Sequence, residues 1–173
     1  DVYETGLYAP QMATVTRLNL EVGQMVKAGQ PVTVLENLEL NMQLNDAEFR
    51  LVQAETSFDV LSSGLRVTSL DLKSAQDNLE RVKVLFDAGA VSRTEYETAV
   101  LRVETAQARM EEQESQLEAV SAELASLRKT REQLAARAGE LTLTSPVDGV
   151  ILSLPVKKGQ VVSPGALVAT VGG

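Results

Sequence analysis

The middle of the chain repeats apolar residues with the period of a coiled-coil helix. Between residues 40 and 86 they recur at alternating steps of four and three, and Thr68 is the single polar member of the series. The same rhythm resumes over residues 96–134, where only Gln113 and Arg131 interrupt it. Apolar seams sustained for more than five heptads on each side predict two long helices packed as a left-handed coiled coil.

A short segment between the two series carries the signals of a turn. Gly89 follows a helical run, so it is expected to end the first helix as a left-handed residue just beyond it. Ser92 and Glu95 have the S-x-x-E spacing of a capping box, which announces a new helix three residues later. One short turn makes the helices antiparallel, with a hairpin tip at about 87–92.

Two further glycines bear on the helices. Gly64 follows two serines at a point of poor helix propensity, but the heptad register passes through it unbroken, so the helix is expected to continue. Gly139 is expected to end the returning helix as a cap residue just outside it.

The two ends of the chain form an internal repeat. All five prolines lie in the first 31 or last 28 residues, which indicates turn-rich β structure there. A shift of 136 residues aligns the ends without a gap for about thirty residues, which is too regular for chance. The matches include Pro10 with Pro146, Leu18 with Leu154, Gly23-Gln24 with Gly159-Gln160, Val26 with Val162, Gly29 with Gly165 and Val32 with Val168.

Each repeat holds short β-prone runs around a G-Q-x-V-x-x-G segment, which supplies two turns with positive φ. A half of this size is too small to fold alone. We therefore predict an α+β fold in which a long antiparallel two-helix coiled-coil hairpin, residues 39–138, is inserted between two halves of a small β-barrel or sandwich, residues 1–38 and 139–173.

Composition narrows the possible functions. The formal charge of −8 argues against a nucleic-acid partner, and the absence of cysteine and histidine excludes thiol chemistry, Cys/His zinc sites and histidine acid/base catalysis. No run of about 18 apolar residues is present to span a bilayer, and no signal-peptide pattern begins the chain. The abrupt start at Asp1 and the end at Gly172-Gly173 suggest a fragment of something longer.

Two V-x-x-G-Q-x-V-x-x-G halves flanking a long hairpin resemble the periplasmic adaptor proteins, or membrane fusion proteins, of the HlyD-like family. The halves resemble a split lipoyl (biotinyl-lipoyl-like) domain, and the sequence Ser145-Pro146-Val147-Asp148-Gly149 is similar to the A-P-x-D-G with which many adaptors enter the second half. In the first half Gln11-Met12-Ala13 stands at that place, so its entry turn is expected to be less tight.

At the tip, Arg81, Leu85 and Ser92 fit the R-x3-L-x6-S pattern of adaptors that meet a TolC-type outer-membrane channel. The resemblance implies a non-enzymatic adaptor without a cofactor, in the periplasm of a Gram-negative bacterium and anchored in the inner membrane when full-length. It would link an inner-membrane transporter to the channel in a tripartite efflux pump or type I secretion system, exporting drugs or other substrates. It would also self-associate, usually as a hexamer.

Each tip residue also has a purely structural explanation. Ser92 can act as a helix cap without any partner, Leu85 can simply close the hairpin, and Arg81 can interact with the dipole at the helix end. The five fixed donors of Arg81 are equally suited to gripping a partner, which is the interpretation favoured by the intact pattern.

Two other functions remain as alternatives. Lys27, Lys157 and Lys158 lie near turns, as in a lipoyl or biotin carrier, but carriers place the modified lysine in the hairpin that joins the two halves, and here the coiled coil takes that place. The chain could also be a self-associating coiled-coil scaffold with no channel partner.

Overall fold

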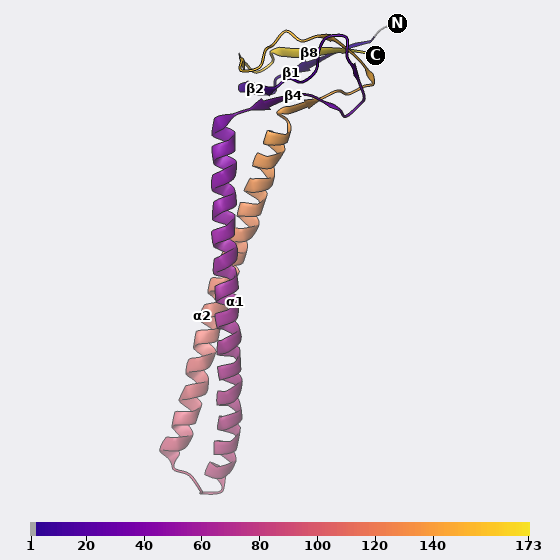
Figure 1. Cartoon of the computed structure of the whole chain (residues 1–173). Helices are drawn as coiled ribbons and strands as arrows, with labels where there is room; N and C mark the ends of the chain where they lie inside the picture. Colours follow the sequence, from indigo (N-terminus) through magenta and orange to yellow (C-terminus); the bar gives the residue numbers. More distant parts are fainter. Residues whose placement is uncertain (1–2) are drawn as a thin grey trace. The chain divides into compact units, whose positions relative to one another are not determined.

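The computed structural model describes residues 3–173, so the first two residues of the predicted segment 1–38 lie outside it. The chain divides into two compact units (Figure 1): one joins the chain up to Glu48 with Lys129–Gly173, and the other is Phe49–Arg128. We call them the β unit and the hairpin unit. The elements in order are β1 Glu4–Tyr8, β2 Ala13–Arg17, β3 Met25–Val26, β4 Pro31–Glu36, α1 Leu38–Asp87, α2 Arg93–Gly139, β5 Thr142–Thr144, β6 Gly149–Ser153, β7 Val161–Val162 and β8 Leu167–Gly172.

The β unit consists of two four-stranded sheets in which every pairing is antiparallel. One sheet has the order β1-β8-β6-β3 and the other β5-β4-β2-β7. Each sheet therefore takes two strands from the N-terminal half of the repeat and two from the C-terminal half. The predicted insertion of a hairpin into a β domain built from two halves is confirmed.

The repeat appears in the structure as an interlocked pair of halves. The bounds of β2, β3 and β4 recur 136 residues later as those of β6, β7 and β8. The Gly23 N–H donates to the Ile151 carbonyl at 2.8 Å, and at the equivalent place the Gly159 N–H donates to the Val15 carbonyl at 2.7 Å. Each half thus fastens its turn to a strand of the other half.

The turns within each half have the predicted chemistry. Four repeat glycines, Gly23, Gly29, Gly159 and Gly165, have φ between 83° and 93°. The glutamine that follows two of them closes the turn, because the Gln24 side-chain oxygen accepts from the Glu21 N–H at 3.2 Å and that of Gln160 accepts from the Lys157 N–H at 3.0 Å. The repeated Gly-Gln pairs therefore serve the turns themselves.

The core of the β unit also holds the two helix ends. Val15, Leu35 and Val168 form one buried cluster together with Leu40 at the start of α1, and Leu134 near the end of α2 packs against it. A second cluster surrounds Ile151 and Val171. Burial of a large aliphatic side chain stabilises by about 1.5–3 kcal/mol, so the first turn of α1 and the last turns of α2 are fixed by the same core as the strands.

The start of α1 is capped by Asn37. Its side-chain oxygen accepts from the Leu40 N–H at 3.0 Å, while its side-chain nitrogen donates to the Met12 carbonyl at 2.9 Å. One amide therefore satisfies an orphan N–H of the helix and ties it to the first half of the β unit.

The helices of the hairpin unit run antiparallel and pack through the predicted seam (Figure 1). Every seam position of α1 between residues 40 and 86 is buried or half-buried, and α1 is continuous through Gly64 as expected. On α2 only Arg131 is exposed among the seam positions. The polar exceptions differ, because Thr68 donates to the Gly64 carbonyl at 3.1 Å, whereas the side-chain oxygen of Gln113 is buried without a partner among the described residues.

The prediction for Gly139 is wrong. Gly139 is the last residue of α2, and its φ is not positive. The helix ends instead because the chain turns into the core: Leu141 is 2% exposed, and its carbonyl accepts from the Leu35 N–H at 2.8 Å in the neighbouring strand. Over residues 3–173, no helix is both long and apolar enough to cross a membrane.

Candidate functional site

The hairpin tip begins where α1 ends in a Schellman motif. The Gly89 N–H donates to the Phe86 carbonyl at 2.9 Å, and the Ala90 N–H donates to the Leu85 carbonyl at 2.8 Å. Both bonds require a left-handed residue at the first position beyond the helix, and Gly89 has φ 75°. The predicted role of Gly89 is confirmed, and the backbone of Leu85 is held inside the motif.

The start of α2 is fixed by Ser92. Its hydroxyl oxygen accepts from the Glu95 N–H at 3.1 Å, three residues into the helix, which is the predicted N-cap bond. The reciprocal bond of a capping box, from the Glu95 carboxylate to the Ser92 N–H, is not formed within the described chain. Only half of the expected box is therefore present.

The seam closes behind the tip with an aromatic pair. The rings of Phe86 and Tyr96 stack with centroids 4.7 Å apart and an interplanar angle of 14°. Both rings are half-buried, while Leu85 remains 45% exposed. Phe86 thus supplies the apolar closure, which leaves much of the neighbouring leucine available at the surface.

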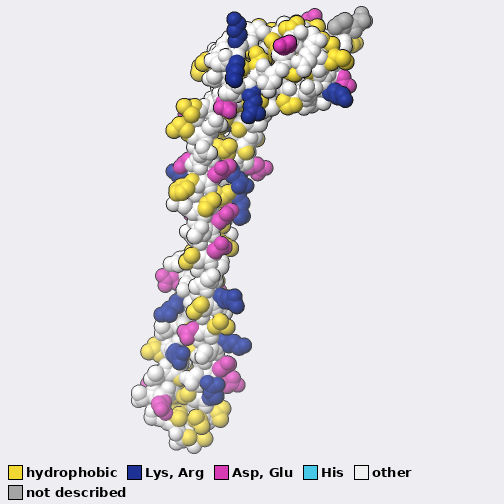
Figure 2. All heavy atoms as spheres, in the orientation of Figure 1, with side chains coloured by type: hydrophobic (Ala, Val, Ile, Leu, Met, Phe, Trp, Pro, Cys, Tyr) yellow, Lys and Arg dark blue, Asp and Glu magenta, His cyan; other side chains and the backbone are white. Residues whose placement is uncertain are grey.

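Arg81 lies one helical turn before Leu85 on the same side of α1. It is exposed and makes no hydrogen bond or ion pair with any residue the structure describes. Together with Glu80, Val84 and Leu85 it lines a shallow, mostly apolar hollow at the surface. Figure 2 shows hydrophobic side chains gathered at this end of the hairpin unit, with charged ones among them.

A second hollow on another side of the tip also includes Leu85. It lies between the two helices and is lined by Asn78, Val82, Leu85, Val91, Thr94, Glu95, Thr98, Ala99 and Arg102. Leu85 therefore forms the ridge between two hollows. Ser92 lines neither of them, so the structure brings Arg81 and Leu85 together but places Ser92 apart, at the helix start.

One exposed tip residue was missed by the sequence reasoning. Val84 is 66% exposed and lies in the hollow with Arg81 and Leu85. A signal was present, because Val84 is apolar although it falls outside the seam series next to two pattern residues. Large apolar residues on the outward side of a coiled coil have no packing role within the hairpin.

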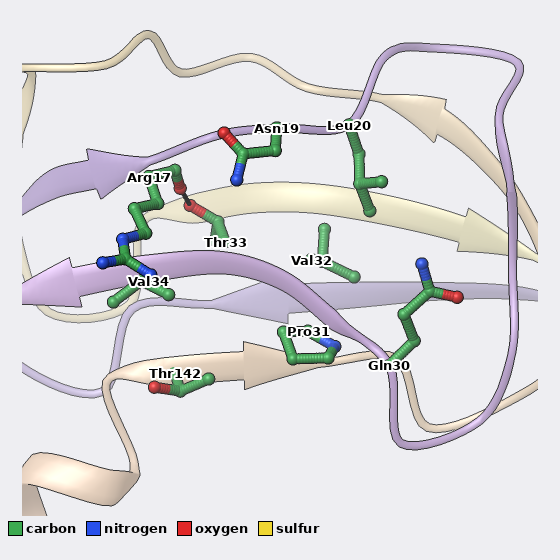
Figure 3. A pocket seen from close by; sticks show the side chains of 9 residues that line it. All are labelled: Arg17, Asn19, Leu20, Gln30, Pro31, Val32, Thr33, Val34 and Thr142. Atoms are coloured by element: carbon green, nitrogen blue, oxygen red, sulfur yellow. Dashed lines mark hydrogen bonds between the residues drawn. The ribbon is translucent and has the colours of Figure 1, made fainter.

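The β unit has a hollow of its own beside β4 (Figure 3). Its lining includes Arg17 and Asn19, which follow β2, and Thr33, whose hydroxyl donates to the Arg17 carbonyl at 2.7 Å. The equivalent positions in the second half are Ser153, Pro155 and Ala169. The polar lining is thus not shared by the repeat, and none of the predicted site residues lies there.

Solved structures with the same fold extend over nearly the whole chain. "Structure of the periplasmic adaptor protein EmrA" matches 98% of this chain and 72% of that one, with 15% identity and a TM-score of 0.53. MacA from Actinobacillus actinomycetemcomitans matches 94% and 48%, with 21% identity and a TM-score of 0.66. The membrane fusion protein Spr0693 from Streptococcus pneumoniae R6 matches 99% and 63%, with 12% identity and a TM-score of 0.62.

These likenesses establish the fold and agree with the predicted resemblance to periplasmic adaptor and membrane fusion proteins. No protein-family model matches the sequence, and no curated protein matches it either. The chain spans 72%, 48% and 63% of the three structures.

Proposed function

We propose that this chain, which has the fold of periplasmic adaptor proteins, is the hairpin and lipoyl part of such an adaptor and docks through its tip onto a TolC-type outer-membrane channel. The observation that carries the proposal is the unpaired, exposed Arg81 beside the half-exposed Leu85, at the end of a hairpin whose turn is fixed on both sides. A non-enzymatic structural role in export of drugs or other substrates follows from this proposal.

The tip suits contact with the ends of helices in a partner. Arg81 presents five donors in a planar fork, which match carboxylates or the free carbonyls of a helix C-terminus. Leu85 and Val84 add apolar surface beside it. Because the Schellman motif and the Ser92 cap fix the turn, little conformational entropy is lost when these side chains bind.

The other partners follow from the same proposal. Several copies, six in a complete assembly, would stand side by side in the periplasm of a Gram-negative bacterium. The inner-membrane anchor and the contact with an inner-membrane transporter would belong to parts of a full-length adaptor outside this chain. No nucleic acid is involved, since the chain carries a net charge of −8.

Charge reversal at the tip tests the docking role. Arg81→Asp should abolish export, because losing a charged contact at a desolvated interface costs about 2–5 kcal/mol, or roughly thirtyfold or more in affinity. Its melting temperature should stay near wild type, since Arg81 makes no bond within the described chain. Lys83→Asp is the matched control, because Lys83 is exposed on the same turn but does not line the hollow. Wild-type export by the Arg81 variant would refute the proposal, as would an equal loss from the control.

The proposal assigns Ser92 to the cap. Ser92→Asp keeps a good N-cap residue while changing the group offered to a partner, whereas Ser92→Ala removes the cap at a cost of about 1 kcal/mol. We expect crosslinking to the channel to survive Ser92→Asp and to weaken with Ser92→Ala. The opposite order would assign the hydroxyl to the partner.

Two simple measurements separate the alternatives. A carrier protein would gain the mass of lipoate or biotin after expression with a competent ligase, and we expect an intact mass equal to that of the sequence, since α1 and α2 occupy the junction between the halves. Single cysteines at Ala88 or Ala90, both exposed, should crosslink to the channel, whereas a pure scaffold gives only products with itself.

A further inference from the structure

The side of α1 turned away from the seam carries an apolar row. Six large apolar side chains of α1 in the hairpin unit are 59–67% exposed although none belongs to the seam: Phe49, Val52, Val60, Val67, Leu70 and Val84. A row along one side of a helix, with nothing in its own chain to cover it, is larger than scattered surface apolar residues require. It indicates a surface that packs against another molecule.

The outward side of α2 has the complementary character. Leu101 is its single large exposed apolar residue within the described hairpin unit. The remaining outward positions are small or acidic and exposed, and they include Ala108, Ser115, Ala119, Ala122, Glu97, Glu104, Glu111 and Glu118. Small residues allow the backbone of a neighbouring helix to approach closely, so that bulky side chains on the neighbour can fit between them.

The charges on the two outward sides lie at matching levels. Asp71 pairs with Arg102 at 3.5 Å and Glu55 pairs with Arg128 at 3.8 Å, which sets the level of one helix against the other. Arg66 lies between the two pairs on α1, as do Glu104, Glu111 and Glu118 on α2, while Lys73 lies just beyond Asp71. In copies standing side by side at the same height, cations of α1 would therefore face carboxylates of the next α2.

We propose that the outward side of α1 packs against the outward side of α2 in a second copy of this chain, with both hairpin tips pointing the same way. This deepens the proposed function and rests on it for the statement that copies stand side by side. The contact is heterologous, so that each copy uses one surface toward one neighbour and a different surface toward the next, and repetition gives a ring or an open row.

The charges disfavour the like-with-like alternatives. A parallel α1–α1 contact about a two-fold axis would place Arg66 opposite Arg66 and Lys73 opposite Lys73, and an α2–α2 contact would set the glutamate row against itself. Like charges brought together in this way are repulsive, and the repulsion is weakened by salt. The contact between α1 and α2 is the one arrangement in which size and charge both match.

Crosslinking tests the contact in cells that contain the full-length adaptor and its channel. The sequence has no cysteine, so chains carrying Leu70→Cys and chains carrying Ala108→Cys can be coexpressed and joined with a short bis-maleimide. Both positions are exposed on outward sides. We expect the mixed 70–108 product to exceed either self-product about tenfold, the ratio that corresponds to about 1.4 kcal/mol. Gln107→Cys replaces Ala108→Cys as the control, since Gln107 is exposed but points along the edge of the hairpin.

A dominant 70–70 product, equal yields with Gln107→Cys, or no product at all would overturn the proposed contact. Val67→Asp should reduce the 70–108 product about tenfold, and far-UV circular dichroism should show the same helix content. Failure of the contact is distinguishable from failure of channel docking. If crosslinks from Ala88→Cys to the channel persist while the 70–108 product is absent, only the lateral contact is wrong, whereas a 70–108 product without any channel crosslink leaves the contact standing and removes the docking role.

Discussion

The hairpin turn can be tested with two substitutions that are chemically the same but should act in opposite directions. A Cβ added at Gly89 or at Gly64 would meet no atom within 4 Å, so crowding distinguishes neither site. The backbone does, because Gly89 has φ 75° at the turn whereas Gly64 lies within α1. Gly89→Ala should destabilise the protein and Gly64→Ala should stabilise it.

The expected sizes follow from the two backbone conformations. Alanine in the left-handed region costs roughly 1–2 kcal/mol, and the reduced freedom of the unfolded chain offsets about 0.4–1 kcal/mol of this. The free energy of unfolding should therefore fall by about 1 kcal/mol in Gly89→Ala. At Gly64 it should rise by about 1 kcal/mol, the difference in helix propensity between alanine and glycine.

Urea unfolding followed by far-UV circular dichroism measures both variants. The midpoint should move down for Gly89→Ala and up for Gly64→Ala, with unchanged slopes. A midpoint that rises with Gly89→Ala would refute a left-handed residue at the turn. A midpoint that falls with Gly64→Ala would contradict a regular helix through the middle of α1.

Two further predictions concern buried polar atoms and close backbone packing. Gln113→Leu should raise the free energy of unfolding by about 1–3 kcal/mol, because the buried side-chain oxygen has no partner among the described residues, and a lower urea midpoint would show that a partner exists. Gly149→Ala should destabilise the β unit by about 3 kcal/mol or more, since the added Cβ would lie 2.0 Å from the Gly172 carbonyl oxygen. Gly159→Ala is a contrasting variant that meets no atom and suffers only from its φ of 88°, and a Gly149 variant no less stable than it would contradict the close approach.

Features that depend on neighbouring residues were predictable from the sequence. The seam follows from helix periodicity, and the left-handed Gly89 and the Ser92 cap follow from short-range backbone chemistry. Gly139 shows where such signals fail. A glycine is able to adopt the left-handed conformation but is not obliged to, and here the burial of Leu141 ends the helix without it.

Features that depend on distant residues were only partly predictable. The shift of 136 residues showed that two halves exist, yet it could not show that each sheet takes strands from both, because pairing such as that of β1 with β8 joins opposite ends of the chain. At the tip, the sequence pattern named Arg81 and Leu85, but exposure decided that they share a hollow with Val84 and that Phe86 closes the seam.

The shared sheets of the β unit have a consequence for the order of folding. Each edge strand pairs with a strand from the other half, so the N-terminal half cannot complete either sheet until the end of the chain has been synthesised. The helices between them rely on local contacts, which form quickly, whereas sheets with distant partners form slowly. Because the start of α1 and the end of α2 pack in one core, the folded hairpin acts as a clamp that brings the two halves together and shortens the effective loop to be closed. The element that places the tip at one end of the molecule thereby serves as the assembly guide for the β unit at the other.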